Sequence, residues 1–240
     1  SFCAIEQLEP GFHRIPHEAI IAFLHRMHRR GIRDIAFYDD ALLYPAEESK
    51  ALLRRIAAMN RAFRFHTPNA LHLSLIDEEI AHLLKQTGFI NPHFGLDSCD
   101  PALQKQWMDG KITRQTVAEK TDLLKKAGFA EGAFSVYLLL GHPGQRLDAL
   151  KRHIDHVHAC GAKVSLAEFS LIPGTQLFRD FPPPTEEPLY HNNSLFTFFS
   201  GEQISEIWKL KNYTRQLNKR FAAAATDFST LSGGPVRKEG

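Results

Sequence analysis

Hydrophobic and polar positions along the chain follow a repeated unit of roughly 30–40 residues. Each unit contains an amphipathic helical stretch, usually closed by a glycine, and then a short apolar run. The helical stretches are Pro16–Arg30, Glu47–Arg61, Asp77–Thr87, Thr113–Ala127 and Leu147–Cys160. The apolar runs that follow them are Ile32–Tyr38, Ala62–His66, Phe89–Leu96, Ala133–Leu140 and Lys163–Phe169. A glycine suits the left-handed position at a helix end, and the apolar runs predict strands buried on both faces, as in a parallel sheet.

Alternation of helix and strand over these units predicts right-handed βαβ crossovers, and therefore an α/β barrel, part of a barrel, or an open doubly wound sheet. The pattern changes after Pro173. The prolines that follow Phe181 exclude a helix or a central strand, so 181–200 is expected to be an extended surface segment. Gly201–Ala225 predicts one more helix, and Ser232–Gly240 a poorly ordered end. We expect residues 1–180 to form the core domain and residues 181–240 a C-terminal extension.

Composition narrows the class of protein without naming a function. Apolar residues make up 43% and charged residues 23%, which is typical of a soluble globular chain, and a net charge of +2 gives no sign of nucleic-acid binding. No apolar run approaches the ~20 residues that a membrane span needs. The three widely spaced cysteines argue against a disulfide framework and favour a cytoplasmic protein. The chain has no signal peptide or initiator methionine, and its start reads like the middle of a domain, which suggests a fragment.

Candidate chemistry lies where the predicted strands end, because ligands of parallel α/β folds bind at the carboxyl ends of strands. Polar or glycine-rich residues follow every apolar run, namely Asp39-Asp40, Thr67–Asn69, Asp97-Ser98, Gly141–Gln145, and the stretch from Glu168 to Thr175. Simpler interpretations stay open for each. The two Asp-containing pairs could cap helices, and Gly141–Gln145 lacks the spacing of a phosphate-binding loop.

The remaining cysteines and histidines favour structural roles. Cys160 is expected to be a small core residue, and Cys99 has no base fixed beside it that would make it a nucleophile. His153 and His156 have a spacing that one metal could bridge, but a solvated helix face is the stronger interpretation.

Five stretches, in their order and spacing, resemble the radical S-adenosylmethionine (SAM) superfamily, and most of all its branch often found behind a cobalamin-binding domain. Ser1–Cys3 is similar to the tail of the C-x3-C-x2-C loop, and Ile35–Asp40 to a second-strand motif where many relatives have Gly-Gly-Glu. Gly95–Ser98 resembles the fourth-strand motif, Tyr137–Gln145 the fifth, and Ala167–Thr175 the sixth, with Leu171 replacing the usual proline. The resemblance implies a partial TIM-type (β/α)6 barrel of the radical SAM type, with its first strand missing from this chain.

The resemblance also implies roles for particular residues. Cys3 would be the third thiolate ligand of a [4Fe–4S] cluster. Phe2 would lie against the adenine of SAM, and Asp39 and Asp40 would accept hydrogen bonds from its ammonium group. The other implied contacts to SAM are Asp97 and Ser98 with the ribose or methionyl group, the backbone of Gly141, Leu171 and Ile172 with the adenine, and Lys111 with the carboxylate.

The implied activity is reductive cleavage of SAM to a 5′-deoxyadenosyl radical, or methyl transfer through cobalamin held in a domain absent from this chain. A small-molecule substrate and an electron donor such as flavodoxin or ferredoxin would be the partners. Two cluster cysteines would lie upstream of Ser1, so the chain by itself is expected to be inactive. The rival hypotheses are a non-catalytic α/β-barrel module that binds a small ligand, and a TIM-barrel hydrolase or aldolase. The second is weaker, because Lys163 opens its strand and His66 with Asp97 are too few for a metal site.

Overall fold

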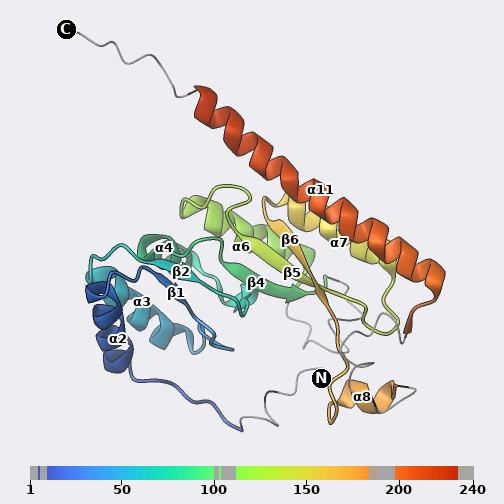
Figure 1. Cartoon of the computed structure of the whole chain (residues 1–240), viewed down its shortest axis with the longest axis horizontal. Coiled ribbons are helices and arrows are strands. Elements are labelled where there is room, and N and C mark those ends of the chain that lie inside the picture. The colour runs from blue at the N-terminus through green and yellow to red at the C-terminus, as the bar shows by residue number, and fades with distance from the viewer. Residues whose placement is uncertain are drawn as a thin grey trace.

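A computed structural model of the chain describes residues 5, 10–99, 103, 112–183, 187 and 198–231, with side chains as far as Phe221. Helices and strands alternate as the sequence pattern predicts (Figure 1). The helices are α2 (His17–Arg29), α3 (Ala46–Ala58), α4 (Glu78–Thr87), α6 (Arg114–Lys126), α7 (Leu147–Ala159), α8 (Gln176–Asp180) and α11 (Gly201–Leu231), with a 3-10 turn η1 (Leu73–Leu75). The strands are β1 (Asp34–Ala36), β2 (Arg64–His66), β3 (Leu71–His72), β4 (His93–Asp97), β5 (Ser135–Leu140) and β6 (Lys163–Glu168).

All strand pairs within the described ranges are parallel, in the orders β1-β2 and β3-β4-β5-β6. Phe65 of β2 links the pair to the larger sheet, since its N–H donates to Gly88 O at 3.0 Å and its carbonyl accepts from Ile90 N at 2.9 Å. The longest register runs from Ser135 opposite Lys163 to Leu140 opposite Glu168. The predicted α/β class with a partial barrel of parallel strands is confirmed.

Most strands are shorter than the apolar runs that predicted them, and one strand was not predicted. The strand expected to start at Phe89 begins at His93, because Pro92 lacks a backbone donor and Asn91 adopts a φ of +47°. The two-residue strand β3 was not predicted, since it is too short to show a hydrophobic period.

The sheet has one packed face and one open face. Side chains on the outer face are almost completely buried beneath the helices, including Phe94, Leu96, Val136, Leu138 and Leu140. The alternate positions form what we call the inner face, whose residues in β3 to β6 are His72, His93, Gly95, Ser135, Tyr137, Leu139, Lys163, Ser165 and Ala167. Asp97 follows a register shift at the end of β4, so alternation does not assign it to either face. Most of the inner-face residues are only partly buried. The strands are therefore not buried on both faces, and the inner face is polar.

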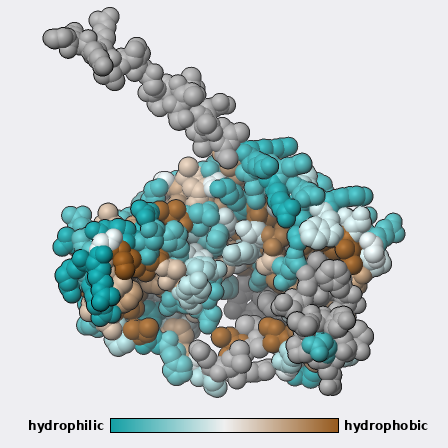
Figure 2. Space-filling view, viewed as in Figure 1, coloured by the Kyte–Doolittle hydropathy of each residue, from teal (hydrophilic) through white to brown (hydrophobic). Residues whose placement is uncertain are grey.

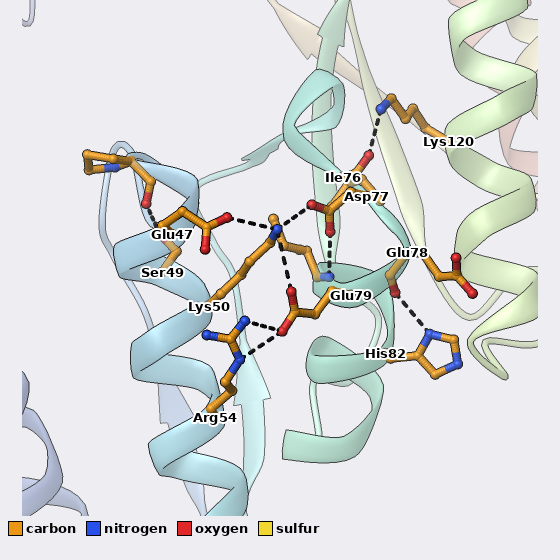
Figure 3. A network of polar contacts seen from close by, with 12 residues as sticks. Glu47, Ser49, Lys50, Arg54, Ile76, Asp77, Glu78, Glu79, His82 and Lys120 are labelled. Atoms are coloured by element: carbon orange, nitrogen blue, oxygen red, sulfur yellow. Dashed lines mark hydrogen bonds and ion pairs between the residues drawn. The ribbon is translucent and has the colours of Figure 1, made fainter.

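A buried lysine joins α3 to α4 (Figure 3). Lys50 Nζ lies 2.7 Å from Asp77 Oδ2, 3.1 Å from Glu47 Oε1 and 3.5 Å from Glu79 Oε2, and its side chain is 11% exposed. Asp77 also caps α4, because its Oδ1 accepts the Ile80 N–H at 2.7 Å. These contacts hold in register the two helices that cover β2 and the Phe89 segment.

The long helix α11 lies along α7 and beside β6 (Figure 1), and the surface of its described part is largely hydrophilic (Figure 2). Its buried residues Ile207, Leu210 and Leu217 belong to the same hydrophobic core as the strands. Gly132 allows close packing here, because a Cβ at this position would lie 2.5 Å from Phe221 Cβ. No helix in the described ranges is long and apolar enough to cross a membrane.

Candidate functional site

The first candidate group lies where β1 and β2 end. Phe37 N donates to His66 O at 2.9 Å, which keeps the two strand ends together. Asn69 Nδ2 then donates to Tyr38 O at 2.8 Å and to Asp40 Oδ1 at 3.2 Å. Surrounding protein atoms raise the pKa of Asp39, although its side chain still reaches solvent. The fold thus brings Asn69 to the predicted Asp39-Asp40 pair and leaves the Asp39 carboxyl facing outward.

The second group is Asp97-Ser98 at the end of β4, where the backbone is strained. Asp97 has a φ of +63°, and the Ser98 N–H donates to Leu96 O at 2.7 Å, which together define a γ-turn of the rarer hand. A register shift between Gly95 and Asp97 accompanies the turn. Burial raises the pKa of Asp97 to about 6. Such strain at a half-buried carboxyl is typical of a functional position rather than of a helix cap.

The third group is the loop after β5, which is held by a side chain. Gly141 has a φ of +93°, and its N–H donates to Gln145 Oε1 at 2.8 Å. Gln145 Nε2 donates in turn to Leu139 O at 2.7 Å. His142 is buried beside Phe169, with ring centroids 5.5 Å apart, and burial lowers its pKa. The loop backbone at the predicted adenine position is therefore fixed in place by Gln145.

The fourth group follows β6. Leu171 is buried in a small cluster with Phe169 and Leu177, whereas Ile172 is 40% exposed. Thr175 Oγ1 donates to Ile172 O at 2.7 Å and accepts the Phe178 N–H at 3.2 Å, so it fixes the turn and caps α8. Of the two predicted adenine contacts, Ile172 exposes its side chain to solvent. The side chain of Leu171 is buried, so only its backbone is available to a ligand.

Glu168, singled out by its place near a strand end, belongs to the outer face. It forms an ion pair with Lys211 of α11, whose ammonium also lies 4.4 Å from the Trp208 ring centroid. This carboxylate is thus committed to docking α11.

Three predicted contacts, Phe2, Cys3 and Lys111, lie outside the described residues. Of the two described thiols, Cys99 is buried and Cys160 partly buried, and burial raises the pKa of both, that of Cys99 to about 12. His153 is buried, while His156 Nε2 lies 3.0 Å from Arg114 O, so the pair does not form a metal site. Within the described ranges, no group of three or more potential metal ligands gathers.

A hydrogen-bonded network on the inner face was not predicted. His93 N donates to Thr67 Oγ1 at 3.0 Å, His93 Nδ1 lies 3.3 Å from Thr67 O, and Asn91 Nδ2 lies 3.2 Å from His93 Nε2. Ser135 Oγ donates to Asn91 Oδ1 at 3.1 Å. The signal in the sequence was the alternation of polar side chains within apolar runs, at His93 and Asp97 and at Ser135 and Tyr137.

Comparison of the sequence and of the fold with known proteins identifies one protein family and several similar solved structures. A family model described as the radical SAM superfamily matches residues 1–157. The radical SAM methyltransferase TsrM from Kitasatospora setae, with cobalamin and a [4Fe–4S] cluster bound, is 22% identical with a TM-score of 0.60, over 70% of this chain and 34% of that chain. The structure of TsrM with tryptophan substrate and the SAM analogue aza-SAM is 21% identical with a TM-score of 0.61, over 70% of this chain and 33% of that chain.

A second solved enzyme shares the fold more loosely. The coproporphyrinogen III oxidase HemN from Escherichia coli, a radical SAM enzyme, is 13% identical with a TM-score of 0.50, over 82% of this chain and 47% of that chain. The chain therefore spans about a third of the TsrM chain and under half of HemN. No curated protein sequence matches the chain.

Proposed function

Because the chain belongs to the radical SAM superfamily, we propose that the intact protein binds SAM at the carboxyl ends of β1, β4, β5 and β6 and cleaves it reductively at a [4Fe–4S] cluster. The observation that carries the proposal is the strained turn at Asp97, which directs a carboxyl with a pKa of about 6 to the edge of the sheet where ligands of such folds bind. SAM carries an ammonium and a sulfonium centre, so a carboxylate is the side chain that suits it.

Each described residue would have a separate task. Asp39 and Asp40 would accept hydrogen bonds from the SAM ammonium, and Asn69 would hold Asp40 in the orientation for this contact. Asp97 and Ser98 would face the ribose or methionyl group. Gly141, held by Gln145, and the Leu171-Ile172 backbone would flank the adenine. Phe2 and Lys111 remain proposed contacts to the adenine and the carboxylate of SAM.

The described side chains do not by themselves fit the cluster. Cys3 would be one thiolate ligand, while Cys99 and Cys160 belong to no group of three or more potential metal ligands among the described residues. The proposal therefore requires further thiolates that the printed sequence does not supply. When bound, the cluster would supply one electron to SAM; the barrel would orient SAM and exclude water.

The test is anaerobic reconstitution of the intact gene product with iron and sulfide. We expect the reconstituted protein to show a broad visible absorbance band that bleaches when the cluster is reduced. The reduced protein should then release 5′-deoxyadenosine from SAM. An intact protein that incorporates no iron would contradict the proposal and favour a non-catalytic binding module. Likeness to TsrM favours cobalamin-linked methyl transfer as the specific reaction. In that case added cobalamin should yield a methylated product and S-adenosylhomocysteine, with little 5′-deoxyadenosine.

A further inference from the structure

The inner face of β4 to β6 is divided into layers by strand register. His93, Ser135 and Lys163 share the layer nearest the amino ends of the strands, and Gly95, Tyr137 and Ser165 share the next. Asp97, which is in register with Leu138 after the shift in β4, lies beyond these layers, toward the proposed SAM site. Gly95 therefore leaves the middle layer without a side chain on β4. A Cβ at position 95 would make only ordinary van der Waals contacts, the nearest at 3.5 Å from Ala70 Cβ. The backbone there could therefore accept an alanine, and glycine leaves that space free of side-chain atoms.

The hydrogen bonds around His93 determine which way Tyr137 can donate. Asn91 accepts from Ser135 through Oδ1, so its amide nitrogen faces His93 Nε2, which must act as the acceptor. The proton of His93 is then on Nδ1, where it donates to Thr67 O. Burial lowers the pKa of His93 and keeps the ring neutral. The Tyr137 hydroxyl lies 3.5 Å from the same Nδ1 and cannot donate to a protonated nitrogen.

Tyr137 therefore has a hydroxyl proton that its neighbour does not accept. The side-chain hydroxyl of Ser165, beside it in register, makes no hydrogen bond within the described ranges. Lys163 opens the same strand on the same face, and no carboxylate among the described side chains pairs with its ammonium. By contrast, the charges that β1 and β2 present are paired, since Asp34 contacts both Arg64 and His66.

We propose that Tyr137, Ser165 and Lys163 form the substrate-binding wall of the barrel, and that the substrate is a small carboxylic acid. Its carboxylate would lie against these donors, and its body would occupy the space over Gly95, with the reacting part toward Asp97. One cation and two hydroxyl donors that have no acceptor among the described side chains complement an anionic acceptor group, because charge-assisted hydrogen bonds are the stronger ones. This inference rests on the proposed function only in naming the ligand as the substrate of that reaction.

Binding of benzoate to the 240-residue chain tests the wall without iron or SAM. Saturation-transfer NMR titrations would compare benzoate with benzyl alcohol, which has the same ring and no carboxylate. We expect saturable benzoate binding that weakens about tenfold in Tyr137→Phe and in Lys163→Met, since each removes one donor to a charged group. Benzyl alcohol should bind more weakly and equally to all variants.

Two further variants keep the result interpretable. Gly95→Ala should keep the melting temperature yet weaken benzoate binding, because its methyl group occupies the proposed space. Tyr213→Phe is the matched control, since its hydroxyl donates to Asp155 between α11 and α7 and lies outside the wall. Equal benzoate affinity in Tyr137→Phe, Lys163→Met and Tyr213→Phe, or no saturable binding to the parent chain, would overturn the inference. Failure of SAM cleavage would not move these binding data.

Discussion

The side-chain amide of Asn218 pairs with both backbone groups of Val164. Asn218 Nδ2 donates to Val164 O at 2.8 Å, and Val164 N donates to Asn218 Oδ1 at 3.0 Å. The amide thus occupies the place of a neighbouring strand along β6 and satisfies an edge that would otherwise be open to pairing with another chain. Helix α11 thereby closes the sheet at β6.

Asn218→Ala should destabilise the fold by about 1–3 kcal/mol, because Val164 then loses both partners in a partly buried position. Urea unfolding followed by circular dichroism measures the change. Asn212→Ala is the matched control, since Asn212 is exposed and contacts only Arg215 of the same helix among the described side chains. Equal unfolding midpoints for the two variants would show that α11 does not seal β6 through this amide.

Gly132→Ala should loosen the packing of α11. The new Cβ would lie 2.5 Å from Phe221 Cβ, and the residue has a φ of +73°. Gly144→Ala separates the two effects, since Gly144 has a φ of +75° and nothing within 4 Å of the added Cβ. We expect Gly144→Ala to cost about 1 kcal/mol from the backbone alone and Gly132→Ala distinctly more. Phe221→Gly, which removes the contacting Cβ, should recover part of this excess in the double variant, and thermal unfolding provides the measurement.

Asp97 should lower stability at neutral pH. Its folded pKa of about 6 is raised above the ordinary value of 3.8 by burial, so its favourable contribution exists below pH 4 and is lost as the pH rises through 6. Asp97→Asn should therefore be more stable than the parent at pH 7–8, by up to about 3 kcal/mol, and should lose this advantage near pH 4. Urea midpoints between pH 4 and 8 measure it, with Asp122→Asn as the exposed control. If the stability difference between Asp97→Asn and the parent did not change with pH, the raised pKa of the buried Asp97 would be contradicted.

The same Asp97→Asn substitution should weaken SAM binding. Loss of the carboxylate removes a charge-assisted contact, so the dissociation constant should rise about tenfold at pH 8. Isothermal titration of the chain with SAM provides the value, and Asp39→Asn should act in the same direction. Unchanged affinity in both variants, with Asp122→Asn equally unaffected, would place the SAM site elsewhere.

Lys50→Met should destabilise the α3–α4 contact, because Glu47, Asp77 and Glu79 would face one another without their shared cation (Figure 3). The pKa of Asp77 is held below its ordinary value, against the effect of burial, by the Ile80 N–H and by Lys50. The associated stability is present above pH 4 and is lost as the pH falls through the folded pKa. The melting temperature of Lys50→Met should therefore fall less between pH 7 and 3 than that of the parent. Lys209→Met, at an exposed position of α11 that forms no ion pair among the described residues, should keep the parental dependence.

The sequence by itself determined the long helices, their alternation with parallel strands and the polar residues that follow each apolar run, but not the short elements α8 and β3. These follow from local periods and from glycines such as Gly88 and Gly161, whose φ values of +97° and +89° end helices. The pattern also placed Asp39, Asp97 and Gly141 at strand ends, since the end of an apolar run is visible without a fold.

Only the tertiary structure decided which of those residues meet. Asn69 reaches Asp40 because β1 and β2 are neighbours, and Glu168 turns to Lys211 because α11 packs on the outer face. The network of His93 and Tyr137 depends on the register of β4 against β5, which brings together two residues that are 44 positions apart in the sequence. Burial, pKa and hydrogen-bond partners arise from such long-range contacts, and a local hydrophobic period carries no information about them.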